Sequence, residues 1–594
     1  MKLSMSMIGA LAGFVALASL LRSGARGPWR HELGSVLQTD QVTRGQAARR
    51  PRATLPWREP RTSARSNRSG GVWNPPRREP PPLRWPVGAV FCAVRGWLAS
   101  IWIPWPGGPA RWASRRDLSA LIVSGPVKRR VILGRLASVR SAGGHPSLLA
   151  VESGHSLLVV GPTQSGKTTG LAIPAVIEWE GPVVAASVKS DLVLATMGCR
   201  SELGGVQVYD PTGVTGFRPA LWSPLTACFT WAGARHMAAG MAEVAREDAG
   251  TLDDGAFWYA TAAKLLAPLF HAAAISGRTM SDVVRWVDRH EVEEVAEALE
   301  GAGALEALQA AEASWGRDER QMSSVYTTAE TVIEVFADPG VAASAGQGIH
   351  GVSAGVSAGV SAGVGAVVDP GGHEDTNVTV DPVAFLSGPN TLYLCSPAHG
   401  QRRLRPLFST LVGQLIEVAF ERASRTGAPV DPPLLVVLDE AANVAPLAEL
   451  DVLASTAAGH GVHLVTIWQD LAQIGARYGA RSGSVVNNHR AKLFLPGITD
   501  PGTLEHASLL AGDCEKHLRA TTVGRGGDAS TTDQLTSRRL LPPDELRRLR
   551  PGSGLLLYGH LPPAIVHLRC DSTRGTGCTP ETAAGLLSRG RPVL

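Results

Sequence analysis

A glycine-rich segment, GPTQSGKT at residues 161–168, constrains this chain more than any other feature, because it matches G-x-x-x-x-G-K-[S/T] in full. The segment SLLVV at residues 156–160, apolar from Leu157 on, predicts a short strand, and residues 169–179 after the loop predict a helix. In such a unit the glycines let backbone N–H groups turn inward toward nucleotide phosphates, and the helix N-terminus adds positive charge. The segment therefore predicts a nucleotide-binding loop.

The residue types in this loop predict the contacts. Lys167 supplies positive charge to the β- and γ-phosphates, and the hydroxyl of Thr168 can ligate Mg²⁺. We therefore expect ATP and Mg²⁺ as cofactors. The predicted cofactor-binding residues are Gly161, Pro162, Thr163, Gln164, Ser165, Gly166, Lys167, Thr168 and Thr169.

A second acidic element follows the apolar run at residues 434–438, which reads LLVVL and predicts a buried strand. Asp439 and Glu440 come directly after it. Two carboxylates at a buried strand end are costly unless a cation is present. We predict that Asp439 contributes to the Mg²⁺ site and that Glu440 polarises the attacking water. The alternative is a strand that ends in a solvated acidic loop.

A third element is the apolar run at residues 462–468, which is followed by Gln469. An amide at this strand end can sense the γ-phosphate and report its hydrolysis, so Gln469 joins Lys167 and Glu440 as a predicted catalytic residue. The alternative is an ordinary polar residue at a strand end. An arginine finger adds roughly 10³–10⁵ in rate to such chemistry. Three arginines downstream of Gln469 could be offered to the site of a neighbouring subunit, namely Arg477, Arg481 and Arg490. An arginine on the solvated surface is, however, the commoner case.

The N-terminal region carries the membrane signals. The 18 residues 4–21 hold no charge and span about 27 Å as a helix, close to the thickness of the hydrocarbon core. A signal peptide is the alternative, but no clear small-residue cleavage site follows. Residues 22–85 then contain 14 arginines and 4 acidic residues, with many prolines. A second apolar stretch, 87–105, carries Arg95 near its centre, and its insertion energy is close to zero.

From about residue 118 the pattern becomes that of an α/β protein, in which apolar runs alternate with helical periodicity. Several runs are apolar on both faces, as buried parallel strands are. We expect a doubly wound sheet with the phosphate loop near its start. The predicted organisation is a transmembrane anchor at 1–25, a basic linker at 26–85, a second membrane or interfacial segment at 86–106, two parts of the nucleotide-binding domain at 118–230 and 381–575, an inserted all-α domain at 231–342, a low-complexity loop at 343–380 and a tail at 576–594.

Composition narrows the functional classes. The net charge of +5 on 594 residues excludes a polybasic nucleic-acid coat, and only 7 of the 57 basic residues are lysine. The seven cysteines form no C-x-x-C pair, so we predict no zinc site or disulfide framework, and a reducing compartment. The GVSA tetrapeptide that begins at residue 351 repeats three times and indicates an extended surface loop without an assigned function.

The combined motifs resemble the type IV coupling proteins of the TraG/TraD family, the inner-membrane ATPases of conjugative DNA transfer. The resemblance covers roughly residues 130–570. It is carried by GPTQSGKTTG at 161–170, VYDPTG at 208–213, WSPL at 222–225, FW at 257–258, LLVVLDEAANVAPL at 434–447, GHGVHLVTIWQDLAQI at 459–474, RYG at 477–479 and LLPPDELRRLRPGSGLLLYG at 540–559.

The resemblance implies a RecA-like P-loop core that assembles as a homohexamer around a DNA channel. It implies an all-α domain that recognises substrate or relaxosome, and a membrane-anchored chain with its ATPase domain in the cytoplasm. The implied partners are DNA without sequence specificity, a relaxase and the components of a type IV secretion system. Two features depart from the family. Only Lys189 matches the family's pattern after the second strand, and the two apolar segments lie some 65 residues apart.

We therefore expect a membrane-anchored, ATP-driven DNA translocase that couples a relaxase–DNA substrate to a conjugation or type IV secretion pore. One alternative is an FtsK/HerA-like translocase of duplex DNA, although the stretch after residue 570 is too short for the winged helix that such motors often append. A second alternative is an ATP-dependent receptor for exported protein effectors. A third is a membrane scaffold without turnover, against which the intact Lys167, Asp439 and Glu440 argue.

Overall fold

The computed structural model describes residues 109–137, 147–249, 255–346, 378–397, 400–523 and 529–569. The expected membrane segments at 1–25 and 86–106, the linker at 26–85, the GVSA repeat and the tail at 576–594 all lie outside the described residues. Within the described ranges, we find no helix with the length and apolar character that a membrane crossing requires.

A large mixed sheet forms the centre of the described chain. Its 12 strands run in the order β1-β3-β2-β14-β13-β10-β4-β9-β8-β5-β7-β6. The strands are β1 (Ile122–Val123), β2 (Ile132–Leu136), β3 (Leu148–Ala150), β4 (Leu157–Val160), β5 (Val183–Ser187), β6 (Val206–Tyr209), β7 (Thr391–Cys395), β8 (Leu434–Leu438), β9 (Val462–Trp468), β10 (Ala491–Phe494), β13 (Ser553–Tyr558) and β14 (Ala564–His567).

The sheet has a parallel half and an antiparallel half. The seven strands from β10 to β6 pair in parallel, whereas β13, β14, β2, β3 and β1 pair antiparallel on the other side of β10. The apolar runs expected at residues 434–438 and 462–468 are confirmed as strands β8 and β9. The antiparallel half departs from the all-parallel pattern of a doubly wound sheet. A short run that is apolar on both faces is compatible with either direction, because direction depends on the connections between strands.

Both faces of the sheet are covered. Leu158 and Val160 of β4 belong to one hydrophobic cluster, while Leu157 and Val159 belong to a second cluster on the opposite face. Alternation along a strand sends successive side chains to opposite faces, so a strand that is apolar at every position needs cover on both.

The helices lie between these strands in the chain. They are η1 (Thr168–Ala172), α4 (Ile173–Glu178), α5 (Asp191–Ser201), η2 (Pro224–Ala227), α6 (Trp231–Ala249), α7 (Gly255–Ile275), α8 (Met280–Arg289), α9 (Glu293–Gly301), α10 (Leu305–Trp315), α11 (Glu319–Ile333), η3 (Glu334–Ala337), α12 (Pro339–Ala345), α13 (Pro382–Phe385), α14 (Gln401–Thr426), α15 (Leu450–Thr456), η4 (Ala457–His460), α16 (Leu471–Tyr478), η5 (Gly479–Arg481), α17 (Ser482–Asn488), α18 (Pro501–Ala511) and α19 (Pro543–Arg547).

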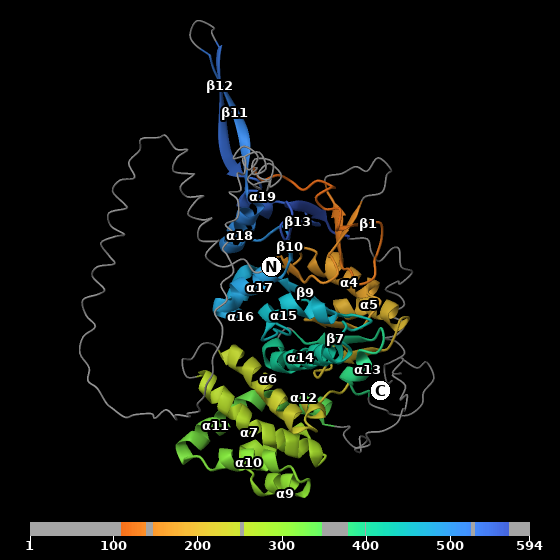
Figure 1. The fold of residues 1–594 in the computed structure, drawn as a ribbon, viewed down its shortest axis with the longest axis vertical. Helices are drawn as coiled ribbons and strands as arrows, with labels where there is room; N and C mark the ends of the chain where they lie inside the picture. Colours follow the sequence, from red (N-terminus) through yellow and green to blue (C-terminus); the bar gives the residue numbers. More distant parts are fainter. Residues whose placement is uncertain are drawn as a thin grey trace, which may run out of the picture. The chain divides into compact units, whose positions relative to one another are not determined.

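Seven of these α-helices, α6 to α12, follow one another between β6 and β7 without a strand among the described residues. Helix α7 is buried around most of its circumference and forms the centre of this group (Figure 1). Trp286 of α8 and Phe336 of η3 are among the largest fully buried side chains of this helical group. Trp286 and Phe336 belong to one hydrophobic cluster with Leu404 and Leu411 of α14. The helical segment therefore packs on the core through α14.

A long hairpin, β11 (Asp513–Val523) with β12 (Ala529–Arg539), forms a separate two-stranded sheet that the sequence patterns did not predict. Its base is held by ion pairs of 2.9 Å from Arg539 to Glu505 and from Arg538 to Glu545. Its strands are polar along much of their length, so apolar periodicity gives little signal for them.

Candidate nucleotide-binding site

The glycine-rich loop leaves β4 at Val160 and turns at once. The N–H of Gly161 donates to the carbonyl of Trp468 at 3.0 Å, which ties the start of the loop to the end of β9. A Cβ on Gly161 would lie 2.8 Å from Ser165 Oγ and 2.9 Å from Leu495 Cβ, so only glycine fits here. Gly166 has φ +87°, a conformation that side chains with a Cβ rarely adopt.

The helix after the loop differs in detail from the expectation. Residues Thr168–Ala172 form a π-helical turn, and regular α-helix begins only at Ile173. Such turns are rare and occur frequently at functional sites. Gly170 permits close packing here, since a Cβ at that position would lie 2.9 Å from Leu568 Cβ at the end of the antiparallel half of the sheet.

Lys167 is buried, with only 6% of its surface exposed. Its Nζ has no hydrogen-bond partner among the described residues. Burial lowers its pKa, and the charges of Asp439, Glu440 and Asp470 oppose that shift. A buried ammonium without a hydrogen-bonding partner is costly on its own. An incoming phosphate would supply the missing acceptor, so the buried position of Lys167 suits the binding of a nucleoside triphosphate.

Thr168 and Asp439 are brought together by the fold. Thr168 Oγ1 donates to Asp439 Oδ2 at 2.8 Å, and Ser187 Oγ donates to the same oxygen at 3.5 Å. Burial raises the pKa of Asp439, while the Thr168 hydrogen bond and the charge of Lys167 act in the opposite direction. A hydroxyl beside a buried carboxylate is an oxygen donor set that suits Mg²⁺.

Glu440 adopts a left-handed backbone conformation, with φ 65°. A non-glycine residue in this region is uncommon, and such strain clusters at functional sites. The N–H of Asn443 donates to the Glu440 carbonyl at 2.8 Å, and Asn443 Nδ2 approaches Glu440 Oε2 at 3.5 Å. These contacts hold the residue in the turn that follows β8.

Gln469 is half-buried at the carboxyl end of β9, the strand between β4 and β8. Its N–H donates to Gln473 Oε1 at 3.0 Å. No hydrogen bond involves its side-chain amide within the described part of the chain. Because Trp468 pairs with Val160 of β4, Gln469 comes to the same edge of the sheet as the phosphate loop.

The three arginines that could act as an arginine finger on a neighbouring subunit have different surroundings. Arg481 donates to the carbonyl of Ala448 at 2.9 Å and pairs with Asp451 at 3.3 Å. Arg477 is half-buried on α16. Arg490 is exposed and precedes β10, at the edge of the sheet opposite to the phosphate loop. Arg490 therefore cannot serve the site of its own chain.

Comparison with known families identifies the chain. A family model described as "Type IV secretory system Conjugative DNA transfer" matches residues 111–347, and a second, "TraM recognition site of TraD and TraG", matches residues 433–551. The two models fall on either side of β7, so together they include the phosphate loop, Asp439 and Gln469. The chain belongs to the type IV coupling proteins.

Individual relatives agree with this assignment. A conjugal transfer protein TraG of Escherichia coli is 26% identical over 490 residues, which cover 75% of this chain and 71% of that protein. Protein VirD4 of Agrobacterium fabrum is 23% identical over 511 residues, covering 81% and 70% of the two chains. The solved structure of the unbound bacterial conjugative coupling protein TrwBdeltaN70 matches with a TM-score of 0.52 at 18% identity, covering 76% of this chain and 96% of that one. That likeness confirms the α/β fold of the P-loop core.

Two further residues of this coupling protein reach the site although sequence reasoning assigned them no role. Ser187, at the end of β5, contacts Asp439, whereas Lys189, the residue that matched the family pattern, is exposed. Burial lowers the pKa of Lys167, and the charge of Asp470 opposes that shift. Asp470 also caps α16 by accepting from the Gln473 N–H at 2.8 Å. Ser187 ends β5, which pairs with β8, and Asp470 follows β9, which pairs with β4. A polar residue at the end of an apolar strand is the sequence signal that could have identified both.

Proposed function

We propose that this chain is an ATP-driven DNA translocase that couples a relaxase–DNA substrate to a conjugation or type IV secretion channel. The observation that carries the proposal is the 2.8 Å hydrogen bond from Thr168 to Asp439 beside the buried ammonium of Lys167. It unites the phosphate loop with the acidic strand end in a member of the coupling-protein family. TrwB, a neighbour with a TM-score of 0.50 at 19% identity, has been solved in complex with an ATP analogue.

The residues of the site divide the work of phosphoryl transfer. Backbone N–H groups of residues 161–169 and the Lys167 ammonium hold the phosphates and neutralise their charge. Mg²⁺, when bound, supplies Lewis-acid stabilisation of charge on the phosphate oxygens. Thr168 and Asp439 are the residues that would hold it. Glu440 orients and deprotonates the attacking water, and Gln469 senses the γ-phosphate from the adjacent strand end.

The assembly that we propose is a homohexamer with a RecA-like core and the helices α6–α12 as an inserted all-α domain. Arg490 is the candidate for donation to a neighbouring subunit, because it lies at the edge of the sheet opposite to the phosphate loop of its own chain. The match to a TraM recognition model supports relaxosome components as partners. We also propose that residues 1–25 anchor the chain in the inner membrane, with the ATPase domain in the cytoplasm. The uncharged residues 4–21 motivate this part of the proposal.

The experiment measures ATP hydrolysis by the purified full-length chain in detergent, with and without DNA. We expect Mg²⁺-dependent turnover that DNA stimulates, and its loss in Lys167→Ala. Lys189→Ala is the matched control, because that lysine is exposed, and it should keep its activity. DNA binding through phosphate contacts should weaken about 10³-fold or more between 50 and 200 mM salt and depend little on base sequence. Turnover that survives in Lys167→Ala, or that DNA leaves unchanged, would overturn the proposal.

A further inference from the structure

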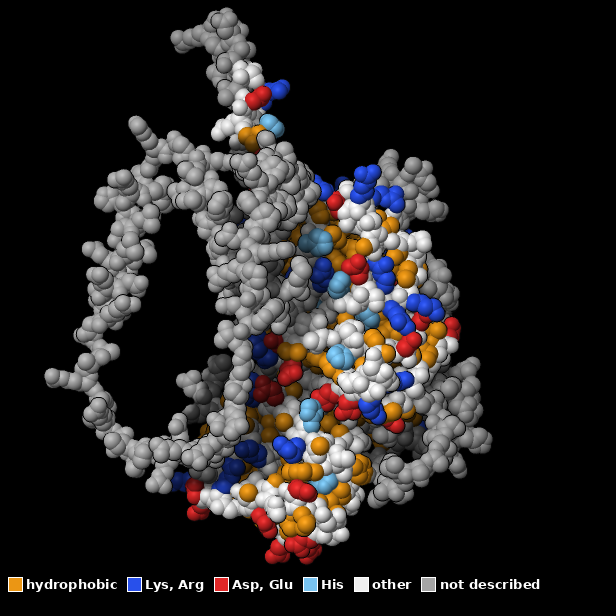
Figure 2. Space-filling model, in the orientation of Figure 1, with side chains coloured by type: hydrophobic (Ala, Val, Ile, Leu, Met, Phe, Trp, Pro, Cys, Tyr) orange, Lys and Arg blue, Asp and Glu red, His pale blue; other side chains and the backbone are white. Residues whose placement is uncertain are grey.

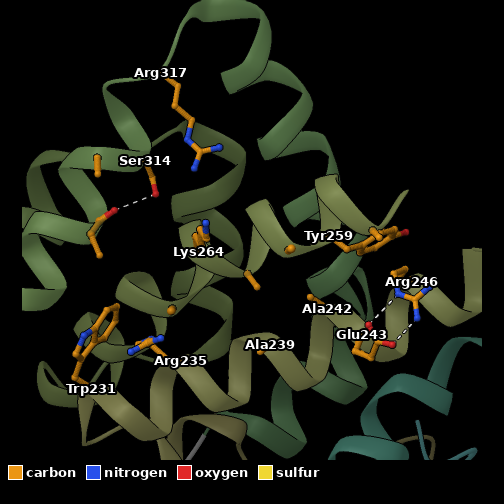
Figure 3. A pocket seen from close by; sticks show the side chains of 16 residues that line it. Trp231, Arg235, Ala239, Ala242, Glu243, Arg246, Tyr259, Lys264, Ser314 and Arg317 are labelled. Carbon is orange, nitrogen blue, oxygen red and sulfur yellow. Dashed lines mark hydrogen bonds and ion pairs between the residues drawn. The ribbon is translucent and has the colours of Figure 1, made fainter. Parts of the chain in front are cut away.

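A groove lies in the helical segment, away from the nucleotide site. It runs between α6, α7 and α10 and encloses about 620 Å³. Figure 3 shows Lys264 near its middle, with Arg317 on one side and Trp231 and Arg235 on another. None of its lining residues belongs to the phosphate loop or to the acidic strand end, so it constitutes a separate feature of the protein.

The groove is elongated and has a floor of small side chains. Its α6 wall extends from Trp231 to Arg246, about 22 Å along a helix. Its α7 wall presents alanines at helical spacing, at positions 256, 260, 263 and 267. Alanine side chains allow another backbone to approach closely, and the length corresponds to about four helical turns. These dimensions suit a helix.

Positive charge dominates the lining of the groove. Arg235, Lys264 and Arg317 form no ion pair among the described residues. The carboxylate of Glu243 pairs with Arg246, whose guanidinium lowers the pKa of that acid. Three cationic side chains are therefore available to an anionic ligand.

Two helices near the groove carry mainly acidic side chains. Helix α9 carries four glutamates and no basic residue, and α10 carries two more. Figure 2 shows acidic side chains gathered at the end of the molecule where Figure 1 places α9. Acidic side chains therefore lie beside the basic groove, and an acidic ligand would be repelled by α9 and attracted to the groove.

We propose that this groove binds an acidic amphipathic helix of a partner protein. Its apolar face would lie on the alanine floor, and its carboxylates would pair with Arg235, Lys264 and Arg317. Single-stranded nucleic acid fits less well, because successive bases need a row of stacking surfaces. The aromatic side chains in the groove lining are the half-buried Trp231 and Tyr259, which is 9% exposed. The inference rests on the proposed role of α6–α12 as an inserted all-α domain, and it does not depend on ATP hydrolysis.

The test uses the full-length protein and a fluorescent, helical alanine–leucine peptide of about 18 residues with a glutamate on every turn, about 27 Å long. The double variant Arg235→Glu/Lys264→Glu should bind the peptide at least about tenfold more weakly, equivalent to about 1.4 kcal/mol. Ala260→Trp should weaken binding similarly by filling the groove without changing its charge. A peptide with lysines in place of the glutamates should not bind.

The matched control reverses two exposed arginines that do not line the groove, Arg289→Glu/Arg425→Glu. This variant should retain the wild-type affinity for the acidic peptide. Equal weakening in both double variants would show only long-range charge attraction and would overturn the proposal. Undiminished binding of the peptide to Ala260→Trp would also overturn the proposal. So would a single-stranded oligonucleotide that displaces the peptide and whose own binding depends on Arg235 and Lys264. Because the readout is peptide binding, it stands whether or not the ATPase proposal holds.

Discussion

Thr168 and Asp439, separated by 271 positions in the chain, share a hydrogen bond of 2.8 Å between Oγ1 and Oδ2. The bond joins the end of the phosphate loop to the end of β8. Ser187 approaches the same carboxylate oxygen from the neighbouring strand β5. The oxygen atoms that would face a magnesium ion are therefore oriented by the protein before the ion arrives.

This relationship predicts that a hydroxyl at position 168 controls magnesium dependence. Thr168→Val retains the shape but removes the oxygen, and should raise the Mg²⁺ concentration for half-maximal ATP hydrolysis about tenfold, equivalent to about 1.4 kcal/mol. Thr168→Ser keeps the oxygen and should resemble the wild type. A magnesium titration of ATP hydrolysis distinguishes the two, and equal dependence in both variants would remove Thr168 from the metal site.

Glu440 is predicted to act in hydrolysis and not in binding. Glu440→Gln should bind ATP with nearly wild-type affinity and turn it over about 10²- to 10⁴-fold more slowly, since only activation of water is lost. Equilibrium binding of a fluorescent ATP analogue and steady-state turnover measure the two effects separately. A variant that hydrolyses ATP at the normal rate would show that another group activates the water.

Arg200 is predicted to be essential for stability. Its guanidinium is fully buried and donates to Thr391 Oγ1 and to the carbonyls of Val176, Trp179, Gly181 and Pro389. Arg200→Met should lower the free energy of unfolding by about 3 kcal/mol or more, because several buried acceptors lose their donor. Urea titration followed by tryptophan fluorescence measures it. Arg425→Met, at an exposed position, should change stability by less than about 0.5 kcal/mol.

Two buried histidines predict a loss of stability in mild acid. Burial lowers the pKa of His489 to about 4 and that of His463 to about 4. The unfolded chain binds protons near the ordinary pKa of about 6.5, so stability is complete above that pH and falls as the pH drops toward 4. The loss should approach roughly 3 kcal/mol per histidine.

The measurement is the urea midpoint between pH 7 and pH 4.5. The neutral ring of His489 bonds the carbonyl of Val485 at 2.7 Å and Thr466 Oγ1 at 3.1 Å. His489→Gln should therefore lower stability at pH 7 but flatten its dependence on pH. A slope that is unchanged by this substitution would assign the acid sensitivity to other groups.

Local sequence was sufficient for much of the core. Strands β8 and β9 begin and end at the predicted residues, because a fully apolar run bounded by turn residues specifies a buried strand without reference to its neighbours. The strongly polar hairpin β11–β12 was not predicted, since its strands lack apolar alternation. The π-helical turn at Thr168–Ala172 was also missed, because it results from packing around the loop and not from residue propensity.

The amino-acid sequence by itself determined which residue types stand at the proposed site: the phosphate loop, the Asp439–Glu440 pair and the glutamine that follows β9. These depend on residue type and short spacing, which are local properties. Only the tertiary structure decided that β9 lies between β4 and β8, that Ser187 and Asp470 join the site, that half of the sheet is antiparallel, and that α6, α7 and α10 enclose a cationic groove. Those facts depend on contacts between residues far apart in the chain, and burial of both faces of the sheet selects them.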